Sequence, residues 1–249
     1  MKRERTEAII LHTFPSRERD KLVVFLTSDH GKKKGWAYGS RSMKNRFGAA
    51  LEPLSKVRIG YLERETDEVV RIESVDLQRS LFDAHQNLAS SMAATYIAET
   101  VDTFAQPDDP SETLYRLLDR SCEVLLGGGD PAYVVAYVEV WVLKLAGIFP
   151  SMKNCSHCHE SLERPLRYDE QQNGFVCRNC APRSLAVLPN DTTDAIELLM
   201  RSRTEDFAGG QHPDLSIFEI RSLARNVRRN FLGHELKSHD LLGGALARR

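Results

Sequence analysis

Residues 155–180 read CSHCHESLERPLRYDEQQNGFVCRNC and contain two Cys-x-x-Cys pairs separated by 18 residues. One such turn aims two sulfurs at a metal ion, and two turns joined by a hairpin complete a tetrahedral site of four sulfurs. The sequence between the pairs favours a hairpin, because Leu166–Tyr168 and Phe175–Cys177 flank the turn signal Asn173-Gly174. We therefore predict a zinc ribbon at about residues 151–183, with four ligands: Cys155, Cys158, Cys177 and Cys180.

The four cysteines indicate a structural metal rather than a catalytic one, since four thiolates leave no coordination position open. We expect one Zn²⁺ per chain. His157 and His159 lie inside and beside the first pair, so replacement of one ligand by histidine is an alternative. Disulfides or unliganded thiols are others, but disulfides are disfavoured in a chain of 249 residues without an export signal. Zinc ribbons occur in nucleic-acid binders, enzymes and scaffolds, so the motif does not indicate a function.

The charges of the chain are unevenly distributed. Hydrophobic residues make up 41% and charged residues 28%, as in an ordinary globular protein, and the formal net charge is −1. Residues 1–50 nevertheless hold twelve Lys and Arg against five acids, whereas residues 81–154 hold four against ten. A basic end joined to an acidic middle is typical of a module that binds a polyanion.

Signal-peptide and membrane-span patterns are both missing from the sequence. The apolar run Ala8–Leu11 is too short for the core of a signal peptide. The longest apolar segment, Ala132–Ile148, is interrupted by Glu139 and Lys144. We therefore expect a cytoplasmic protein without a membrane partner.

Residues 6–77 have the pattern of short β-strands. Five runs rich in branched and aromatic residues are separated by Gly, Pro, Asp or Ser, and they lie at Ala8–Phe14, Leu22–Thr27, Gly35–Tyr38, Val57–Leu62 and Val69–Val75. Five short strands without a long helical pattern favour a small closed barrel, because closure removes exposed strand edges. An SH3-like barrel fits this pattern about as well.

A basic segment with interleaved aromatics, Gly31–Gly48, is the most distinctive part of this region. Phosphate neutralisation by Lys and Arg, together with base stacking on aromatics, is how single strands are held without sequence recognition. The alternative is a solvated charged loop with Trp36 and Tyr38 in the barrel core, and we expect at least one of these aromatics to pack inward. The candidate DNA-binding residues are Lys32, Lys33, Lys34, Trp36, Tyr38, Arg41, Lys44 and Arg46.

From Leu81 the apolar residues recur with helical spacing, which predicts helices over most of residues 81–249. Ser111 is a cap signal for the second helix. The third, Ala132–Leu145, is apolar nearly all round and should be the buried centre of a bundle. Glu139 in this helix lies either at the rim of the bundle or buried with a partner.

Two further helices are predicted after the ribbon. Thr192 or Thr193 caps a short helix at Ala195–Met200, and the last helix spans Ser216–Leu232. The last helix carries an apolar stripe and, opposite it, a stripe of arginines. This basic stripe is either a solvated face or a contact for phosphate or a protein partner, and it consists of Arg221, Arg225, Arg228 and Arg229.

Motifs for nucleotide or nucleophile chemistry are missing from the sequence. It has no Walker loop, Gly-rich dinucleotide turn, Gly-x-Ser-x-Gly elbow or His-Glu-x-x-His. The paired carboxylates Asp108/Asp109 and Glu205/Asp206 lie in turn-like contexts that need no catalysis to explain them. We therefore predict that the protein is not an enzyme.

Several short motifs occur in order along nearly the whole chain, at Glu7–Leu11, Arg19–Val23, Thr27 with Gly31-Lys32, Tyr38–Arg41, Arg46–Pro53 and Phe231–Leu242. Together with a ribbon inserted late in a helical domain, this ordered set resembles the bacterial RecO family of recombination-mediator (DNA repair) proteins. One departure is His239, where the family would have arginine.

The resemblance implies an α+β fold, with a five-stranded OB-fold barrel at residues 1–80 and an α-helical domain at 81–249 that carries the four-cysteine zinc ribbon. It also implies a protein of the nucleoid that binds single- and double-stranded DNA and anneals complementary strands. Such a protein helps load recombinase onto strands coated by single-strand-binding protein, with RecR as partner and without nucleotide hydrolysis.

In this family the helical domain receives the acidic C-terminal tail of single-strand-binding protein. An apolar groove rimmed by arginines such as Arg225 or Arg228 would suit a tail that combines carboxylates with apolar residues. The resemblance therefore leaves two uses for the last-helix arginines, DNA phosphate or an acidic tail.

Two other classes of function remain open at this point. One is a zinc-ribbon interaction scaffold whose basic loop binds an acidic protein partner. The other is a zinc enzyme that acts on nucleic acid, which needs the open metal position that four cysteines deny. Salt-sensitive binding of oligonucleotides distinguishes the DNA-binding mediator from the scaffold.

Overall fold

The computed structural model describes residues 1–16, 18–42, 47–64, 66–209 and 217–246. The chain divides into two compact units. Unit 1 comprises Met1–Gly128 and Ser238–Arg249, and unit 2 comprises Gly129–Lys237. Within the described ranges, no helix combines the length and the apolar character needed to cross a membrane.

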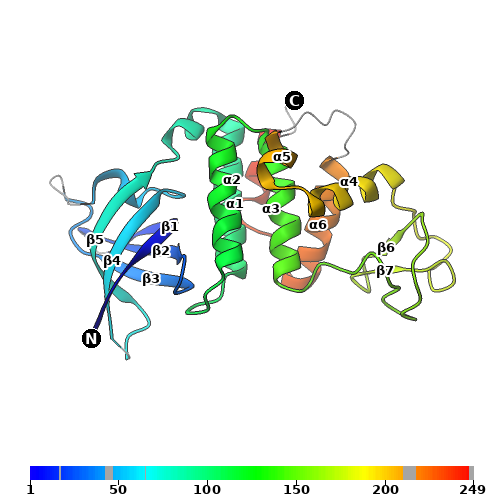
Figure 1. Ribbon diagram of the computed structural model, residues 1–249, viewed down its shortest axis with the longest axis horizontal. Coiled ribbons are helices and arrows are strands. Elements are labelled where there is room, and N and C mark those ends of the chain that lie inside the picture. The colour runs from blue at the N-terminus through cyan, green and yellow to red at the C-terminus, as the bar shows by residue number, and fades with distance from the viewer. Residues whose placement is uncertain (17, 43–46, 65, 210–216, 247–249) are drawn as a thin grey trace. The chain divides into compact units, whose positions relative to one another are not determined.

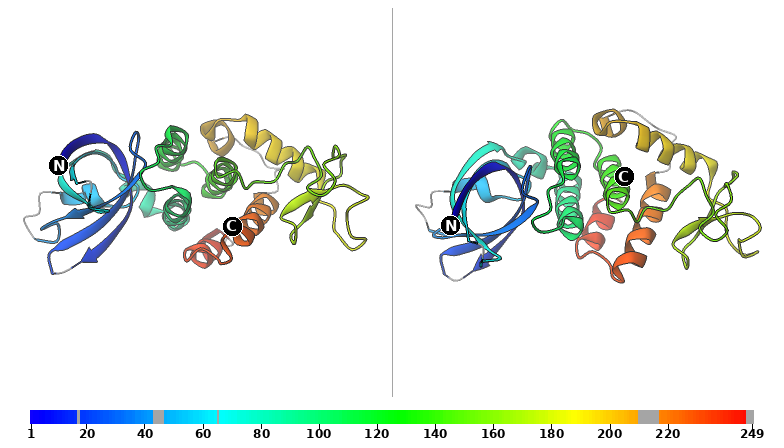
Figure 2. Two further views of the ribbon diagram at one scale, coloured as in Figure 1. Left: turned by 90° about the horizontal axis from the view of Figure 1, so that it is seen from below. Right: turned by 60° about the horizontal axis from the view of Figure 1, so that its bottom comes forward.

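Unit 1 contains a closed five-stranded barrel (Figure 1). Its strands are connected in the order β1-β2-β3-β5-β4, every pair being antiparallel except β3–β5. Figure 2 shows the ring of strands nearly end on. This arrangement is an OB-fold, so the predicted closed barrel of five strands is confirmed. The strands are β1 Lys2–Ser16, β2 Asp20–Thr27, β3 Lys32–Ala37, β4 Lys56–Glu63 and β5 Val70–Arg79, and the 3₁₀ helix η1, Gly48–Leu51, precedes β4.

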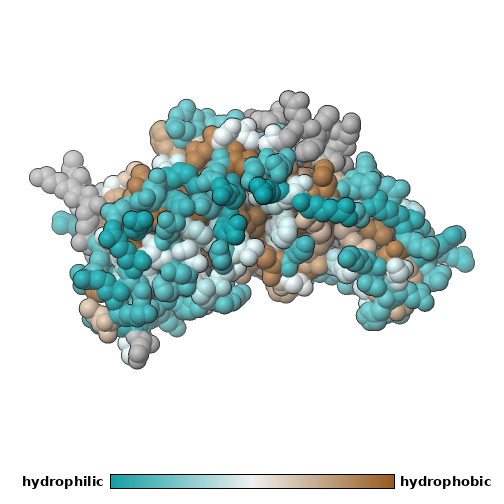
Figure 3. Space-filling view, viewed as in Figure 1, coloured by the Kyte–Doolittle hydropathy of each residue, from teal (hydrophilic) through white to brown (hydrophobic). Residues whose placement is uncertain are grey.

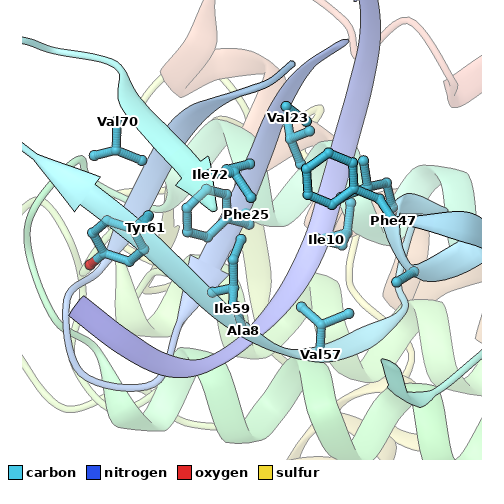
Figure 4. Close-up of a cluster of buried hydrophobic side chains, with 13 residues drawn as sticks. Ala8, Ile10, Val23, Phe25, Phe47, Val57, Ile59, Tyr61, Val70 and Ile72 are labelled. Atoms are coloured by element: carbon cyan, nitrogen blue, oxygen red, sulfur yellow. The ribbon is translucent and has the colours of Figure 1, made fainter. Parts of the chain in front are cut away.

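The barrel interior is filled by inward residues from all five strands (Figure 4). The Phe25 and Tyr61 rings pack 5.9 Å apart at its centre. A Cβ on Gly35 would lie 2.7 Å from the Cγ1 atom of Ile72, so glycine at this position allows the parallel β3–β5 pair that closes the barrel. Outward positions of the strands are mostly hydrophilic, as the face over β4 and β5 in Figure 3 shows.

The expectation that Trp36 or Tyr38 packs into the barrel core is wrong. Gly35 and Ala37 are the buried inward residues of this part of β3, so the strand alternation places Trp36 on the outer face. Tyr38 is 42% exposed. The aromatic of the basic segment that does enter the core is Phe47, which is 3% exposed.

Unit 1 also contains the helices η2 Phe82–Gln86, α1 Leu88–Phe104, α2 Glu112–Leu126 and α7 His239–Leu246, and α7 packs against α1. The Ser111 hydroxyl caps α2 as predicted, by accepting from the Leu114 N–H. Asp119 of α2 binds Lys56 at 2.8 Å and Arg79 at 2.7 Å, and these ion pairs fasten the helix to β4 and β5. The barrel and these helices therefore form one compact unit.

Unit 2 is a helical bundle with the four-cysteine ribbon. Its elements are α3 Pro131–Leu145, β6 Arg167–Asp169, β7 Gly174–Val176, α4 Asn190–Arg201, α5 Thr204–Gly209 and α6 Ile217–Leu232. As predicted, α3 is buried at most of its positions, and it packs against α5 and α6. The predicted start of α4 is wrong, because the helix begins at Asn190, directly after the N-cap Pro189, and Thr192 and Thr193 lie buried inside its first turn.

Candidate metal centre and nucleic-acid interface

The four cysteine sulfurs of unit 2 form one compact cluster. Their Sγ atoms all lie within 4.8 Å of one another, and those of Cys158 and Cys177 are 3.7 Å apart. Tetrahedral Zn–S bonds of about 2.3 Å place sulfurs about 3.8 Å apart, whereas a disulfide requires about 2.0 Å. All four cysteines are free. The cluster is close enough to hold a metal ion, and its donors and spacing are compatible with zinc.

The hairpin between the two pairs differs from the prediction in the position of its turn. The register joins Tyr168 to Phe175 and Asp169 to Gly174, so the turn comprises residues 170–173 and Gly174 belongs to β7. Asn173 adopts φ +47°, a left-handed conformation that asparagine tolerates. Gly174 is required for a different reason, because a Cβ there would lie 2.6 Å from the Ser156 side chain of the first Cys-x-x-Cys turn.

Backbone donors surround the buried sulfur of Cys155. Burial raises the pKa of this thiol, but the N–H groups of Cys158, Cys177 and His157 outweigh burial and lower the pKa to about 6. Hydrogen bonds with the sulfurs of Cys177 and Cys158, in which the Cys180 thiol keeps its proton, raise the pKa of Cys180 to about 12. The Cys155 thiol thus ionises more readily than an ordinary thiol, and a bound dication would allow the other three sulfurs to ionise beside it.

The two histidines near the sulfurs are peripheral. His157 and His159 are both exposed, and the His157 Nδ1 atom is 3.7 Å from the Cys180 sulfur. Among the described residues, the group with metal-ligand spacing consists of the four cysteines alone. The alternative with a histidine ligand is thus not favoured by the geometry.

Polar contacts attach the ribbon to the helices of unit 2. Asn226 of α6 donates to the Glu170 carboxylate at 2.6 Å, and Asn230 donates to the Glu170 carbonyl at 2.6 Å. Arg164 binds Glu197 of α4 at 2.8 Å. These contacts fix the hairpin on the bundle, so loss of the ribbon is expected to loosen α4 and α6 as well.

On the barrel, two lysines of the basic segment form ion pairs within unit 1. Lys32 lies 3.0 Å from Asp102, and the interior Lys33 contacts Glu63 at 2.5 Å and also Asp108. Burial lowers the pKa of Lys33, but the two carboxylates outweigh it and raise the pKa. The main role of these two lysines is therefore to form ion pairs within unit 1.

The exposed cations gather where two loops lie side by side. Arg41 donates its N–H to the Arg19 carbonyl at 3.0 Å, and the Gly39 N–H binds Asp20 at 2.9 Å. The loop after β3 is thereby held against the β1–β2 turn, and both arginines are exposed there. Lys34 of β3 is also exposed. The predicted contacts Lys44 and Arg46 lie outside the described residues.

Trp36 and Tyr38 line a pocket of about 680 Å³ on the outside of the barrel. Trp36 is the register partner of Arg71 across the β3–β5 pair, and Arg71 is the partner of Leu62 on β4. The Arg71 guanidinium carbon lies 5.7 Å from the centre of the Tyr38 ring, at cation–π distance. The pocket is lined by Met1, Trp36, Tyr38, Leu62, Arg64, Asp67, Glu68, Val69 and Arg71.

Sequence reasoning missed the two pocket arginines and Arg19. Arg64 and Arg71 lie about thirty residues from Trp36 in the chain, and only the parallel pairing of β3 with β5 brings them together. For Arg19 and Arg64, one local signal could have indicated a role in binding. Arg19 precedes β2 and Arg64 follows β4, and the β1–β2 and β4–β5 loops of an OB-fold commonly bind oligonucleotides.

The prediction that all four arginines of α6 lie on one outer stripe is wrong. Arg228 is buried, with 1% of its side chain exposed, and it binds Glu139 at 2.6 Å and also Glu235. Glu139 is 3% exposed, so of the two alternatives for this residue the buried one with a partner is correct. A buried carboxylate requires a cation, which explains why Arg228 points inward.

The other three α6 arginines remain at or near the surface. Arg221 lies 4.0 Å from Glu139, Arg225 binds Glu235 at 2.7 Å, and Arg229 is exposed. Burial raises the pKa of Glu235, but Arg225 and Arg228 outweigh burial and lower it. Glu235 is therefore held as a carboxylate by α6.

Comparison with known proteins identifies the family. The family description "Recombination protein O N terminal" matches residues 1–81, and "Recombination protein O C terminal" matches residues 85–239. The chain belongs to the RecO family. The resemblance seen in the sequence is thereby confirmed, and membership indicates a role in recombination repair of DNA.

Curated relatives carry the name "DNA repair protein RecO". The protein of Koribacter versatilis is 31% identical over 237 residues, covering 92% of this chain and 96% of that protein. Those of Anaeromyxobacter dehalogenans and Myxococcus xanthus are 28% and 29% identical, each covering 95% of this chain, with 92% and 93% of their own lengths matched. The similarity thus extends over both units.

Proposed function

We propose that this protein is a DNA-binding mediator of recombinational repair. It binds single- and double-stranded DNA, anneals complementary strands, and helps load recombinase onto strands coated by single-strand-binding protein. Its partners in this role are RecR and the acidic tail of single-strand-binding protein, and it acts without catalysis in the cytoplasm, at the nucleoid. Family membership supports the general role.

The observation that carries this proposal is the surface of the barrel where exposed cations adjoin the half-buried Trp36 and the exposed Tyr38. Lys34 and Trp36 are two residues apart on β3 and share its outer face. Arg19 and Arg41 meet at the adjoining loops, and Tyr38 lies between Trp36 and Arg41 in the chain. Cations of this kind neutralise phosphates, and aromatic faces stack on unpaired bases of any sequence.

We propose a structural role for zinc. One Zn²⁺ is held by the four cysteines, and when bound it cross-links the two Cys-x-x-Cys turns and supplies no catalytic position. The contacts of Glu170 and Arg164 hold the hairpin on α6 and α4.

For the acidic protein tail we propose the α6 arginines that lie at or near the surface. Arg221, Arg225 and Arg229 remain as candidates, because the guanidinium of Arg228 is buried against Glu139 and Glu235. Arg225 already binds one carboxylate at the surface, which is the kind of group such a tail presents.

The test is fluorescence-anisotropy titration of a labelled single-stranded oligonucleotide at several salt concentrations, followed by annealing of its complement without ATP. The triple charge reversal Arg19→Glu, Lys34→Glu and Arg41→Glu should abolish tight binding and annealing, with the salt slope lowered by roughly three. A matched control reverses three exposed arginines elsewhere, namely Arg116, Arg120 and Arg201.

Equal binding by the two triple variants would overturn the proposed surface. Binding of an acidic peptide by the wild type, without affinity for any oligonucleotide at low salt, would instead favour the interaction scaffold. Lys33 is left unchanged in these variants, because glutamate there would face Glu63 and Asp108 and destabilise the barrel.

A further inference from the structure

The pocket beside Trp36 differs in charge from the surface around it. Its lining contains two guanidinium groups, Arg64 and Arg71, and two carboxylates, Asp67 and Glu68. The exposed Lys34, Arg19 and Arg41 lie outside this lining. A phosphate would meet like charge from the two carboxylates, so the pocket is suited to a neutral group, while the phosphates of a strand follow the cations outside it.

The volume and the aromatic and apolar part of the lining indicate a flat aromatic ligand. The volume of about 680 Å³ falls within the roughly 300–1,000 Å³ typical of small-molecule sites. Trp36 and Tyr38 contribute aromatic rings to the lining, and Leu62 and Val69 add apolar surface. Among the parts of a nucleic acid, an unstacked base has this combination of an apolar face and a polar edge.

The polar groups of the pocket select among the bases. A carboxylate accepts two hydrogen bonds side by side, and a guanidinium donates two side by side. Guanine alone presents adjacent donors, N1–H and the N2 amino group, on one edge and adjacent acceptors, O6 and N7, on another. Adenine and cytosine each place their single amino group beside an acceptor, and thymine has one N–H between two carbonyls.

We propose that this pocket takes a single unpaired guanine base of the bound strand, with its face against Trp36 and Tyr38. A carboxylate of Asp67 or Glu68 accepts from the N1–H and N2 amino groups, and Arg71 or Arg64 donates to O6 and N7. This inference rests on the proposed binding of single-stranded DNA by the barrel. It adds a base preference to a surface whose other contacts are with phosphates.

The test compares labelled oligo-dT strands of equal length that carry one dG, dA, dC, dI or dT at the centre, by anisotropy at fixed salt. A single dG cannot form guanine-rich structures, so any difference reports the base itself. The strand with dG should bind about 10-fold more tightly than the all-dT strand, as expected for one bidentate contact. Inosine lacks the N2 amino group and should lose most of this gain.

The double variant Asp67→Asn and Glu68→Gln should abolish the preference for dG while all-dT binding is retained or slightly increased. Glu112→Gln, an exposed substitution on α2, is the control that should keep the preference. Equal affinity of the wild type for dG and dT strands would overturn the guanine pocket and leave the proposed DNA binding intact. A preference that survives the double variant would overturn it equally, whereas failure to bind any strand would refute the proposed function itself.

Discussion

The metal ribbon and the barrel surface differ in how far apart along the chain their partners lie. The four sulfurs come from 26 consecutive residues, and the hairpin that joins them pairs residues less than ten positions apart. On the barrel, Trp36 meets Arg71 across a parallel pair, and Lys32 meets Asp102 seventy positions away. Local sequence therefore determines the first site, and the closure of the barrel determines the second.

The prediction with the largest expected effect concerns the ribbon, whose stability should depend on its metal. Structural zinc contributes about 10–16 kcal/mol to small domains that need it. The double variant Cys177→Ser and Cys180→Ser should reduce the zinc content from about one per chain to none, and should loosen unit 2. Because the ribbon is a local structure, oligonucleotide binding by the barrel should persist. Elemental analysis of the purified protein and anisotropy titration measure the two outcomes.

Cys122→Ala is the matched control for this prediction, since Cys122 is buried on α2 and belongs to no sulfur cluster. It should retain the metal. A wild-type protein that purifies without zinc, or a double variant that keeps it, would contradict the assignment of the four ligands.

The comparison also explains which parts of the molecule could be predicted from the sequence. Cysteine spacing was sufficient for the ribbon, and strand-like runs were sufficient for the five strands, because both signals are local. The turn of the ribbon was misplaced, since Gly174 is needed for close approach of Ser156 and not for the turn. That requirement depends on contacts that neighbouring residues do not reveal.

The errors on the barrel and on α6 have a common physical cause. Trp36 faces outward because Phe25, Phe47 and Tyr61 already fill the interior, which no pattern within β3 indicates. Arg228 faces inward because Glu139, 89 residues earlier, is buried on α3. A charged or aromatic residue is thus placed by its distant partner, and periodicity alone assigns it to the wrong face.

The buried pair of α3 and α6 gives the second largest effect. Arg228→Met leaves Glu139 buried without its main partner and should lower the free energy of unfolding by about 3–5 kcal/mol. Changing both residues to Met should cost much less than the single change, because the unpaired charge is removed. Denaturant unfolding is followed by Trp141 fluorescence in a Trp36→Phe background, so that the signal comes from α3.

Arg229→Met, at an exposed neighbouring position, serves as the control for that experiment. It should change stability by no more than about 0.5 kcal/mol. If the double Met variant were as unstable as Arg228→Met alone, the ion pair with Glu139 would not be the reason for the burial of Arg228.

The smallest expected effect is a difference in the salt dependence of oligonucleotide binding between variants of two adjacent lysines of β3. Lys33 is 10% exposed and neutralised by Glu63 and Asp108, whereas Lys34 is exposed on the outer face. Lys34→Gln should weaken oligonucleotide binding and reduce the slope of log affinity against log salt by about one. Lys33→Gln should leave the slope unchanged, because this lysine already has two carboxylate partners and releases no counterion from DNA. Equal slopes in the two variants would mean that the ion pairs of Lys33 open when DNA binds. The barrel surface would then be larger than the exposed cations indicate, and sequence charge density would be the better guide to it.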